Sequence, residues 1–201
     1  MRFARRRISW LVPLAALFAL SACSAPSSGS DSTGAPGSSE AASPSPSGSV
    51  TIGCDLARPD DPGDSDPGPD DLIVGPLVYL GAVLAYQGTD LPGTAPVPDD
   101  NGVTYFKTGA DLPPDKTVTV SVGDAARSYA GIVIADGPSA GYSSVTYVSC
   151  PTQQQPSRMW WAGGFALIGR QSACVPLDVH VKGESEPRHL QLSLAVDPCD
   201  Q

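Results

Sequence analysis

The 201-residue chain has few of the residues that carry hydrolytic or metal chemistry. It contains two histidines, His180 and His189, and no Gly-x-Ser-x-Gly turn or equivalent that would present an activated serine to a base. The close Cys-x-His-x-Met cluster of a copper site on a β-sandwich is also missing. We therefore predict a protein that is not an enzyme and has no cofactor, with a loosely held zinc or copper ion at the histidines as the remaining metal alternative.

Positive charge is scarce as well: 12 Lys and Arg stand against 21 Asp and Glu, which gives a formal net charge of −9. The first 22 residues carry Arg2, Arg5, Arg6 and Arg7 and no acid, so the chain without them has a net charge of −13. Phosphate binding needs clustered Lys and Arg, so we expect no nucleic-acid partner. An anionic membrane surface would also repel the chain, so membrane attachment has to come from a lipid.

The apolar run at the start of the chain is too short to cross a bilayer as a helix, which takes about 20 residues. It extends over eleven residues, Trp10–Leu20, after a basic start and before the small residues Ser21 and Ala22. This pattern indicates a signal peptide over residues 1–22. Arg5-Arg6-Arg7 also permits a twin-arginine reading, so the export route stays open.

The cysteine after this segment makes it more than an ordinary signal. Leu-Ser-Ala-Cys resembles the bacterial lipoprotein box, which implies that Cys23 receives a diacylglyceryl group and becomes the first mature residue. Two acyl chains suffice for a stable anchor on the outer face of the cytoplasmic membrane. The alternative is a simple secretory signal with an incidental cysteine.

Residues 23–49 lack any apolar period. After Cys23 they are nearly all Ser, Gly, Ala and Pro, and such a segment cannot bury enough surface to offset its chain entropy. We read it as a flexible linker that carries the lipidated cysteine at its start, with O-glycosylation of the Ser/Thr/Pro run as an added alternative. The folded domain is then residues 50–201, long enough for one sizeable core.

Within 50–201 no stretch has a helical apolar period of any length. Alternating or short apolar runs instead predict eight to ten strands: 50–54, 72–80 with an edge or bulge at Gly75-Pro76, 103–107, 117–122, 131–135, 145–149, 159–168 with a bulge at Gly163-Gly164, 175–181 and 190–196. We predict an all-β fold, a disulfide-stabilised antiparallel β-sandwich, with a small β-barrel as the alternative.

Four cysteines remain once Cys23 is assigned to lipid: Cys54, Cys150, Cys174 and Cys199. An even number in an exported domain indicates two disulfides, for which three pairings exist. Cys174 and Cys199 flank one predicted hairpin, so we favour that bond, which leaves Cys54 with Cys150. A bond from Cys54 to Cys199 that ties the two ends together is the close alternative. The hairpin also places His180 and His189 roughly opposite each other.

The acidic loop, residues 55–71, holds seven aspartates and four prolines. Proline at this density prevents regular strand pairing. Asp60, Asp61, Asp64 and Asp66 are weak calcium candidates, because carboxylate oxygens are the ligands calcium prefers, but the prolines break any EF-hand spacing. We expect a solvated loop and no metal.

Trp160 and Trp161 are the better indication of function. Neighbouring residues on a strand point to opposite faces, so one ring should lie in the core and the other outside. An outer ring together with Tyr147 and Arg158 would form a contact surface for a protein or a glycan. The alternative is that the 152–157 loop or the acidic loop covers it.

Several short motifs in residues 50–201 resemble a group of uncharacterised exported lipoproteins of high-GC actinobacteria: Gly-Pro-Leu in the first long strand, Trp-Ala-Gly-Gly-Phe, and Cys-Val-Pro-Leu. The resemblance implies localisation and fold, and it brings no site residues. We therefore expect a membrane-anchored extracytoplasmic lipoprotein that acts as a non-catalytic binding or accessory module of the cell envelope. The alternative is a small-molecule carrier or enzyme with a pocket between the sheets.

Overall fold

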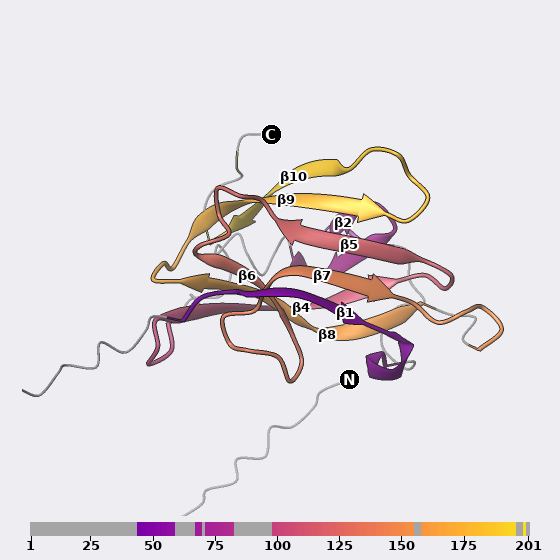
Figure 1. Ribbon diagram of the computed structural model, residues 1–201, viewed down its shortest axis with the longest axis horizontal. Helices are drawn as coiled ribbons and strands as arrows, with labels where there is room; N and C mark the ends of the chain where they lie inside the picture. The colour runs from indigo at the N-terminus through magenta and orange to yellow at the C-terminus, as the bar shows by residue number, and fades with distance from the viewer. Residues whose placement is uncertain are drawn as a thin grey trace, which may run out of the picture. The chain divides into compact units, whose positions relative to one another are not determined.

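The computed structural model describes residues 44–58, 67–69, 71–82, 98–154, 158–195 and 199 (Figure 1). The predicted signal peptide, Cys23 and the linker as far as residue 43 lie outside them. The described chain forms ten strands: β1 (Ser47–Ile52), β2 (Leu72–Val74), β3 (Leu77–Leu80), β4 (Val103–Leu112), β5 (Thr117–Val122), β6 (Ala130–Ile134), β7 (Tyr142–Val148), β8 (Met159–Ile168), β9 (Ala173–Val181) and β10 (Arg188–Leu194), with one short 3-10 turn, η1 (Cys54–Leu56).

All ten strands belong to one sheet, in the order β10-β9-β5-β7-β6-β8-β4-β3-β2, and β1 pairs with β7 beside this path. The sheet curls, so that β10, β9, β5, β7 and β1 lie in front of β2, β4 and β8 in Figure 1. Its two halves face each other as the layers of a sandwich do, while hydrogen bonding continues from one half to the other as in a barrel. The all-β prediction is confirmed.

Alternation along the strands decides which side chains fill the interior. β5 reads Thr-Val-Thr-Val-Ser-Val, and its three valines are completely buried while the hydroxyl residues between them are half-buried. β9 repeats the pattern with Val175, Leu177 and Val179. Strands with this two-residue period bury one face, and the curl brings the buried faces of the two halves together.

Four aromatic rings occupy the middle of this core. Tyr79 on β3 lies 4.9 Å from Phe165 on β8 and 6.4 Å from Tyr147 on β7, measured between ring centroids. Tyr147 in turn contacts Trp161 at 5.6 Å. Tilted and edge-on rings at these separations add stabilisation beyond the area they bury. The cluster therefore joins strands from both halves of the sheet.

Three local expectations differ from the structure. Gly75-Pro76 is a hairpin turn between β2 and β3, not an edge or bulge within one strand, because Gly75 takes a positive φ of 64° that closes the turn. β4 continues to Leu112, because it pairs with β8 residue by residue from Val103 opposite Ile168 to Leu112 opposite Met159. The same unbroken register shows that Gly163-Gly164 makes no bulge.

The first strand also differs. β1 begins at Ser47, inside the predicted linker, and runs parallel to β7, so the sheet is not wholly antiparallel. Its exposed Ser and Gly residues contribute little to the core. Backbone pairing along β7 and the buried Ile52 hold the strand in place.

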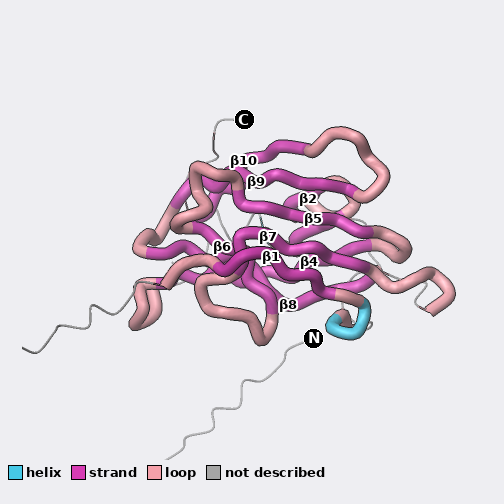
Figure 2. The backbone as a smooth tube through the Cα atoms, in the orientation of Figure 1, coloured by secondary structure: helices cyan, strands magenta, loops and turns pink. Residues whose placement is uncertain are grey.

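Two disulfides fix the ends of strands. Cys54 bonds to Cys150 across 96 residues, and Cys174 bonds to Cys199 across 25, which is the pairing the sequence favoured. Figure 2 shows the strands joined by loops gathered at the two ends of the sheet, and both bonds lie at such ends. Disulfides are typical of an oxidising environment outside the cytoplasm. Within the described residues, no helix has the length and apolar character needed to cross a membrane.

Candidate functional site

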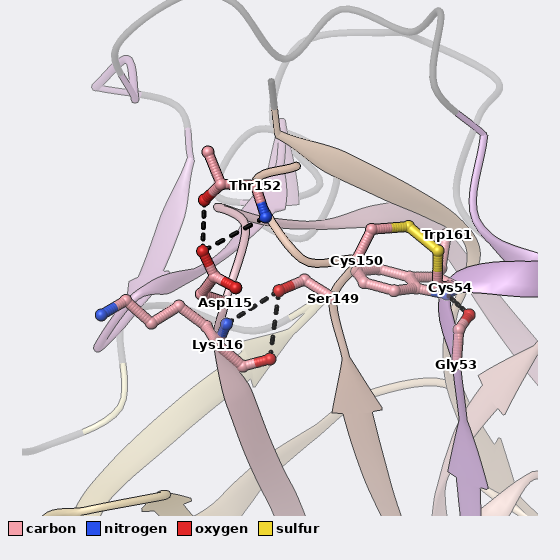
Figure 3. Close-up of a disulfide and its surroundings, with 8 residues drawn as sticks. All are labelled: Gly53, Cys54, Asp115, Lys116, Ser149, Cys150, Thr152 and Trp161. Carbon is pink, nitrogen blue, oxygen red and sulfur yellow. Dashed lines mark hydrogen bonds between the residues drawn. A yellow bond between two sulfur atoms is a disulfide. The ribbon is translucent and has the colours of Figure 1, made fainter. Parts of the chain in front are cut away.

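Trp161 is a core residue. It is 3% exposed, and its indole Nε1 donates a hydrogen bond to the carbonyl of Gly53 at 3.0 Å, next to the Cys54–Cys150 bond (Figure 3). A buried indole needs such an acceptor, and the chain between β1 and η1 supplies it. Of the two candidate rings, Trp161 is therefore the one in the core, and the predicted contact surface does not include it.

Trp160 lies on the outer face, as the two-residue period requires, yet it is half-buried. The ring lies over Gly109 of β4, so closely that a Cβ there would come 1.7 Å from the indole Nε1. The guanidinium of Arg58 lies 5.5 Å from the ring centroid, and the Arg58 amide donates to the carbonyl of Trp160. Arg58 belongs to the acidic loop, so this loop partly covers the Trp160 ring. That agrees better with the alternative in which a loop covers the outer ring than with an open contact patch.

Tyr147 was wrongly assigned to the surface. It is 2% exposed, because it shares the buried face of β7 with Val145. Its hydroxyl lies 3.4 Å from that of Tyr79, and burial raises the pKa of Tyr147 to about 12 despite this hydrogen bond. The phenol therefore stays neutral and acts as part of the core.

Arg158 also has a structural role in place of the predicted contact role. Its Nε donates to the carboxylate of Asp111, and its terminal nitrogen donates to the carbonyls of Pro76 and Asp111. Asp111 is 2% exposed, and its second oxygen, Oδ1, has no hydrogen-bond partner among the described residues. Burial raises the pKa of Asp111, while the hydrogen bond and charge of Arg158 lower it. Arg158 is thus committed to a buried carboxylate.

The histidines do not face each other, contrary to the sequence-based expectation. His189 pairs with Asp178 across β10 and β9, and His180 pairs with Thr119 of β5. Both histidines are exposed. The Nδ1 atom of His189 lies 2.6 Å from Oδ1 of Asp178.

One row across the outer face holds His189, Asp178, Ser121 and Ser144, each opposite the next, and the two serine hydroxyls lie 2.9 Å apart. This row has the residue types of a hydrolytic triad in the wrong order. The carboxylate stands between the imidazole and the hydroxyl, whereas a triad needs the imidazole beside the nucleophile. The arrangement does not activate a serine.

The calcium candidates Asp60, Asp61, Asp64 and Asp66 lie outside the described residues. In the part of the chain that the structure describes, no three His, Cys, Asp or Glu side chains are grouped so as to hold a metal ion. The neighbouring Asp71 has a structural task, because its carboxylate accepts hydrogen bonds from the amides of Gly68 and Gly81.

A groove of about 490 Å³ opens between β2 and the β9–β10 hairpin. Its walls are lined by Leu72, Ile73, Pro176, Leu177, Asp178, His189, Leu190 and Gln191. This volume falls within the range of about 300–1,000 Å³ typical of ligand sites. A second hollow beside η1 and Trp161 measures about 120 Å³, which suits water or a small group better than a ligand.

The groove lies where the two ends of the sheet meet. β10 and β2 are the first and last strands of the hydrogen-bonded order, so among the described residues each has a sheet neighbour on one side only. At one end the gap is closed by contact: a Cβ on Gly75 would lie 3.2 Å from Cγ2 of Val181 and 3.7 Å from Cζ of Arg188. Beyond this contact, the groove is lined by Leu72 and Ile73 of β2 and by His189, Leu190 and Gln191 of β10.

Sequence reasoning missed this site. Ile73 is 59% exposed, although it stands in the apolar run Leu-Ile-Val. Three apolar residues in succession before a Gly-Pro turn were a usable signal, because alternation must place one of them outside.

The chain matches no protein-family model, no curated protein and no solved structure. The candidate site therefore stands on its own geometry.

Proposed function

We propose that the protein is a lipid-anchored, non-catalytic binding module outside the cytoplasmic membrane, and that the groove between β2 and β10 is its ligand site. The observation that carries the proposal is a hollow of ligand size lined by β2 and β10, the two strands that end the sheet in the described part of the chain. The groove combines apolar side chains with a few polar ones, which is the usual composition of a binding site.

The anchoring half of the proposal rests on the sequence. The Leu-Ser-Ala-Cys box ending at Cys23 and the Ser/Gly/Pro linker after it suit a tethered domain, and so does the resemblance to exported actinobacterial lipoproteins. Two disulfides fit the same compartment. An enzyme is disfavoured because both histidines are exposed and one is bonded to a carboxylate rather than to a nucleophile.

The experiment uses the full chain expressed in an actinobacterial host. Replacing Cys23 by Ala should move the protein from the membrane fraction to the soluble fraction and abolish labelling by an alkyne-tagged fatty acid. If C23A stays in the membrane fraction, the anchor is wrong.

The site is tested in the same cells with a photo-crosslinking amino acid at Ile73 or at Leu56. The two side chains are matched controls, 59% and 60% exposed, and only Ile73 lines the groove. We expect a discrete adduct from Ile73 and none from Leu56. Equal labelling, or none at Ile73, would exclude the groove as the binding site.

A further inference from the structure

The groove has a feature that an ordinary pocket lacks: one wall is the free edge of a long strand. β10 spans seven residues and, within the part of the chain that the structure describes, pairs with β9 alone. In an antiparallel pair every second residue of an edge strand directs its amide and carbonyl away from its partner. Of the β10 residues, His189, Leu190 and Gln191 line the groove, and alternate residues of this stretch direct backbone donors and acceptors away from β9.

We propose that this groove binds an extended, cationic peptide segment of a partner protein, which adds to β10 as a further strand. This inference rests on the proposed function, since it names the ligand of the same site. Backbone pairing with an exposed edge is a recurring mode of peptide recognition, in which main-chain hydrogen bonds supply affinity and alternate side chains supply specificity.

The dimensions agree with a strand. Strands in a sheet lie about 4.8 Å apart, packed layers about 10 Å apart, and each residue advances about 3.3 Å, so one residue fills roughly 160 Å³. The groove of about 490 Å³ thus holds about three residues. β2, which forms the opposite wall, is three residues long.

The side chains that line the groove determine which residues of the bound peptide would fit there. Leu190 lies beside the core and, with Leu72 and Ile73, gives apolar contact to alternate side chains of the peptide. His189 and Gln191 point to the outer face and leave room for polar residues. An alternating peptide therefore fits the two faces of this site.

Charge sets the preference for a cation. Among the described lining residues Asp178 is the one carboxylate; its side chain is 45% exposed, and its Oδ1 atom lies 2.6 Å from Nδ1 of His189. The nearby Arg188 is bonded twice to Glu184, whose carboxylate offsets its positive charge. A lysine or arginine on the outer face of the added strand would meet the Asp178 carboxylate.

The test uses nitrogen-15-labelled protein starting at residue 23, with Cys23→Ser. The probe is the capped peptide Thr-Val-Lys-Val-Lys-Val-Thr, with valines for the inner face and lysines for the outer. We expect amide shifts confined to β10, β9 and β2, with a dissociation constant below about 1 mM. Two control peptides carry glutamate for lysine or proline for valine.

Each control probes one part of the inference. Proline removes three backbone donors, so the proline peptide should bind at least about tenfold more weakly. The glutamate peptide should bind about fivefold more weakly, and Asp178→Asn should remove much of that difference, as for an exposed ion pair. His180→Asn, outside the groove lining, is the control variant and should change neither affinity.

The inference is overturned if the lysine peptide causes no shift at about 1 mM, or if the proline peptide binds equally well. Shifts that grow with protein concentration and need no peptide would assign the edge to a second copy of the chain. If the Ile73 adduct in cells resists protease, its ligand is a lipid or glycan. In that case the proposed function survives and the peptide inference does not.

Discussion

Two regions of the domain differ in how their backbone groups are bonded. One is the disulfide corner, the Cys54–Cys150 bond with its neighbours Asp115, Lys116, Ser149 and Thr152; the other is the groove between β2 and β10. At the corner, polar side chains bond the backbone of neighbouring segments: Ser149 Oγ accepts from the Lys116 amide and donates to its carbonyl, and Asp115 accepts from Thr152 (Figure 3). At the groove, two sheet edges stop short of each other. Hydrogen-bonded backbone resists local unfolding, whereas an unpaired strand edge can pair with another chain. We therefore expect the corner to contribute stability and the groove to contribute binding.

The largest expected effect comes from breaking the corner. In the chain-entropy picture, a bond that closes 96 residues stabilises the fold by about 4.7 kcal/mol, and one that closes 25 residues by about 3.5 kcal/mol. The double variant C54S/C150S should therefore lose more stability than C174S/C199S in urea denaturation. The reverse order would show that the C-terminal bond, near the groove, holds the domain.

The buried ion pair gives the next effect. Arg158→Leu leaves the Asp111 carboxylate buried without its partner, so we expect a loss of about 3–5 kcal/mol at neutral pH. Urea denaturation of R158L and of D111N/R158L measures this loss in the free energy of unfolding. The double variant should be the more stable of the two. Arg188→Leu, which breaks only the exposed pair with Glu184, should leave the midpoint unchanged.

The same pair predicts a direction for pH. Burial raises the folded-state pKa of Asp111, and removing Arg158 takes away the two largest causes that lower it. The folded state then binds a proton more strongly than the unfolded chain. The R158L variant should regain stability as the pH falls through the raised pKa, and D111N/R158L should not. A parallel fall in both variants would contradict this assignment.

A smaller effect is expected where Trp160 rests on β4. The Gly109→Ala substitution places a methyl group where the indole lies, so the ring must swing outward. Tryptophan emission should shift to the red and acrylamide quenching should increase, because Trp161 alone stays protected. Unchanged emission would mean that the ring is not seated on Gly109.

The smallest change in stability belongs to the groove. Ile73→Ser should alter the free energy of unfolding by less than about 0.5 kcal/mol, as expected for an exposed site, and Leu56→Ser should do the same. The two variants should differ in peptide binding, because only Ile73→Ser should lower the affinity for the lysine peptide. A large loss of stability in I73S would place that side chain in the fold and not at an open site.

Local patterns foretold most of the fold. The runs 117–122 and 159–168 match β5 and β8 residue for residue, because alternation and apolar content act within a strand. Tyr147 was predictable as well, since it shares parity with Val145. Local sequence also required that one of the adjacent tryptophans face inward.

The rest depends on contacts between distant segments. Ser47–Ile52 pairs with β7 through backbone groups, so its Ser and Gly composition gave no sign of a parallel strand. Burial of Asp111 depends on Arg158, 47 residues away. The groove depends on how far the whole sheet curls, which no single strand encodes.

Residue-resolved amide hydrogen exchange of the unliganded protein tests the central comparison most directly. β7 has neighbours on both sides, β5 and β1, so its paired amides should exchange slowly along its length. In β10 slow and fast amides should alternate, and the lysine peptide should protect the fast ones. If every β10 amide is as protected as those of β7 before any peptide is added, the edge is already paired and the groove is not an open site.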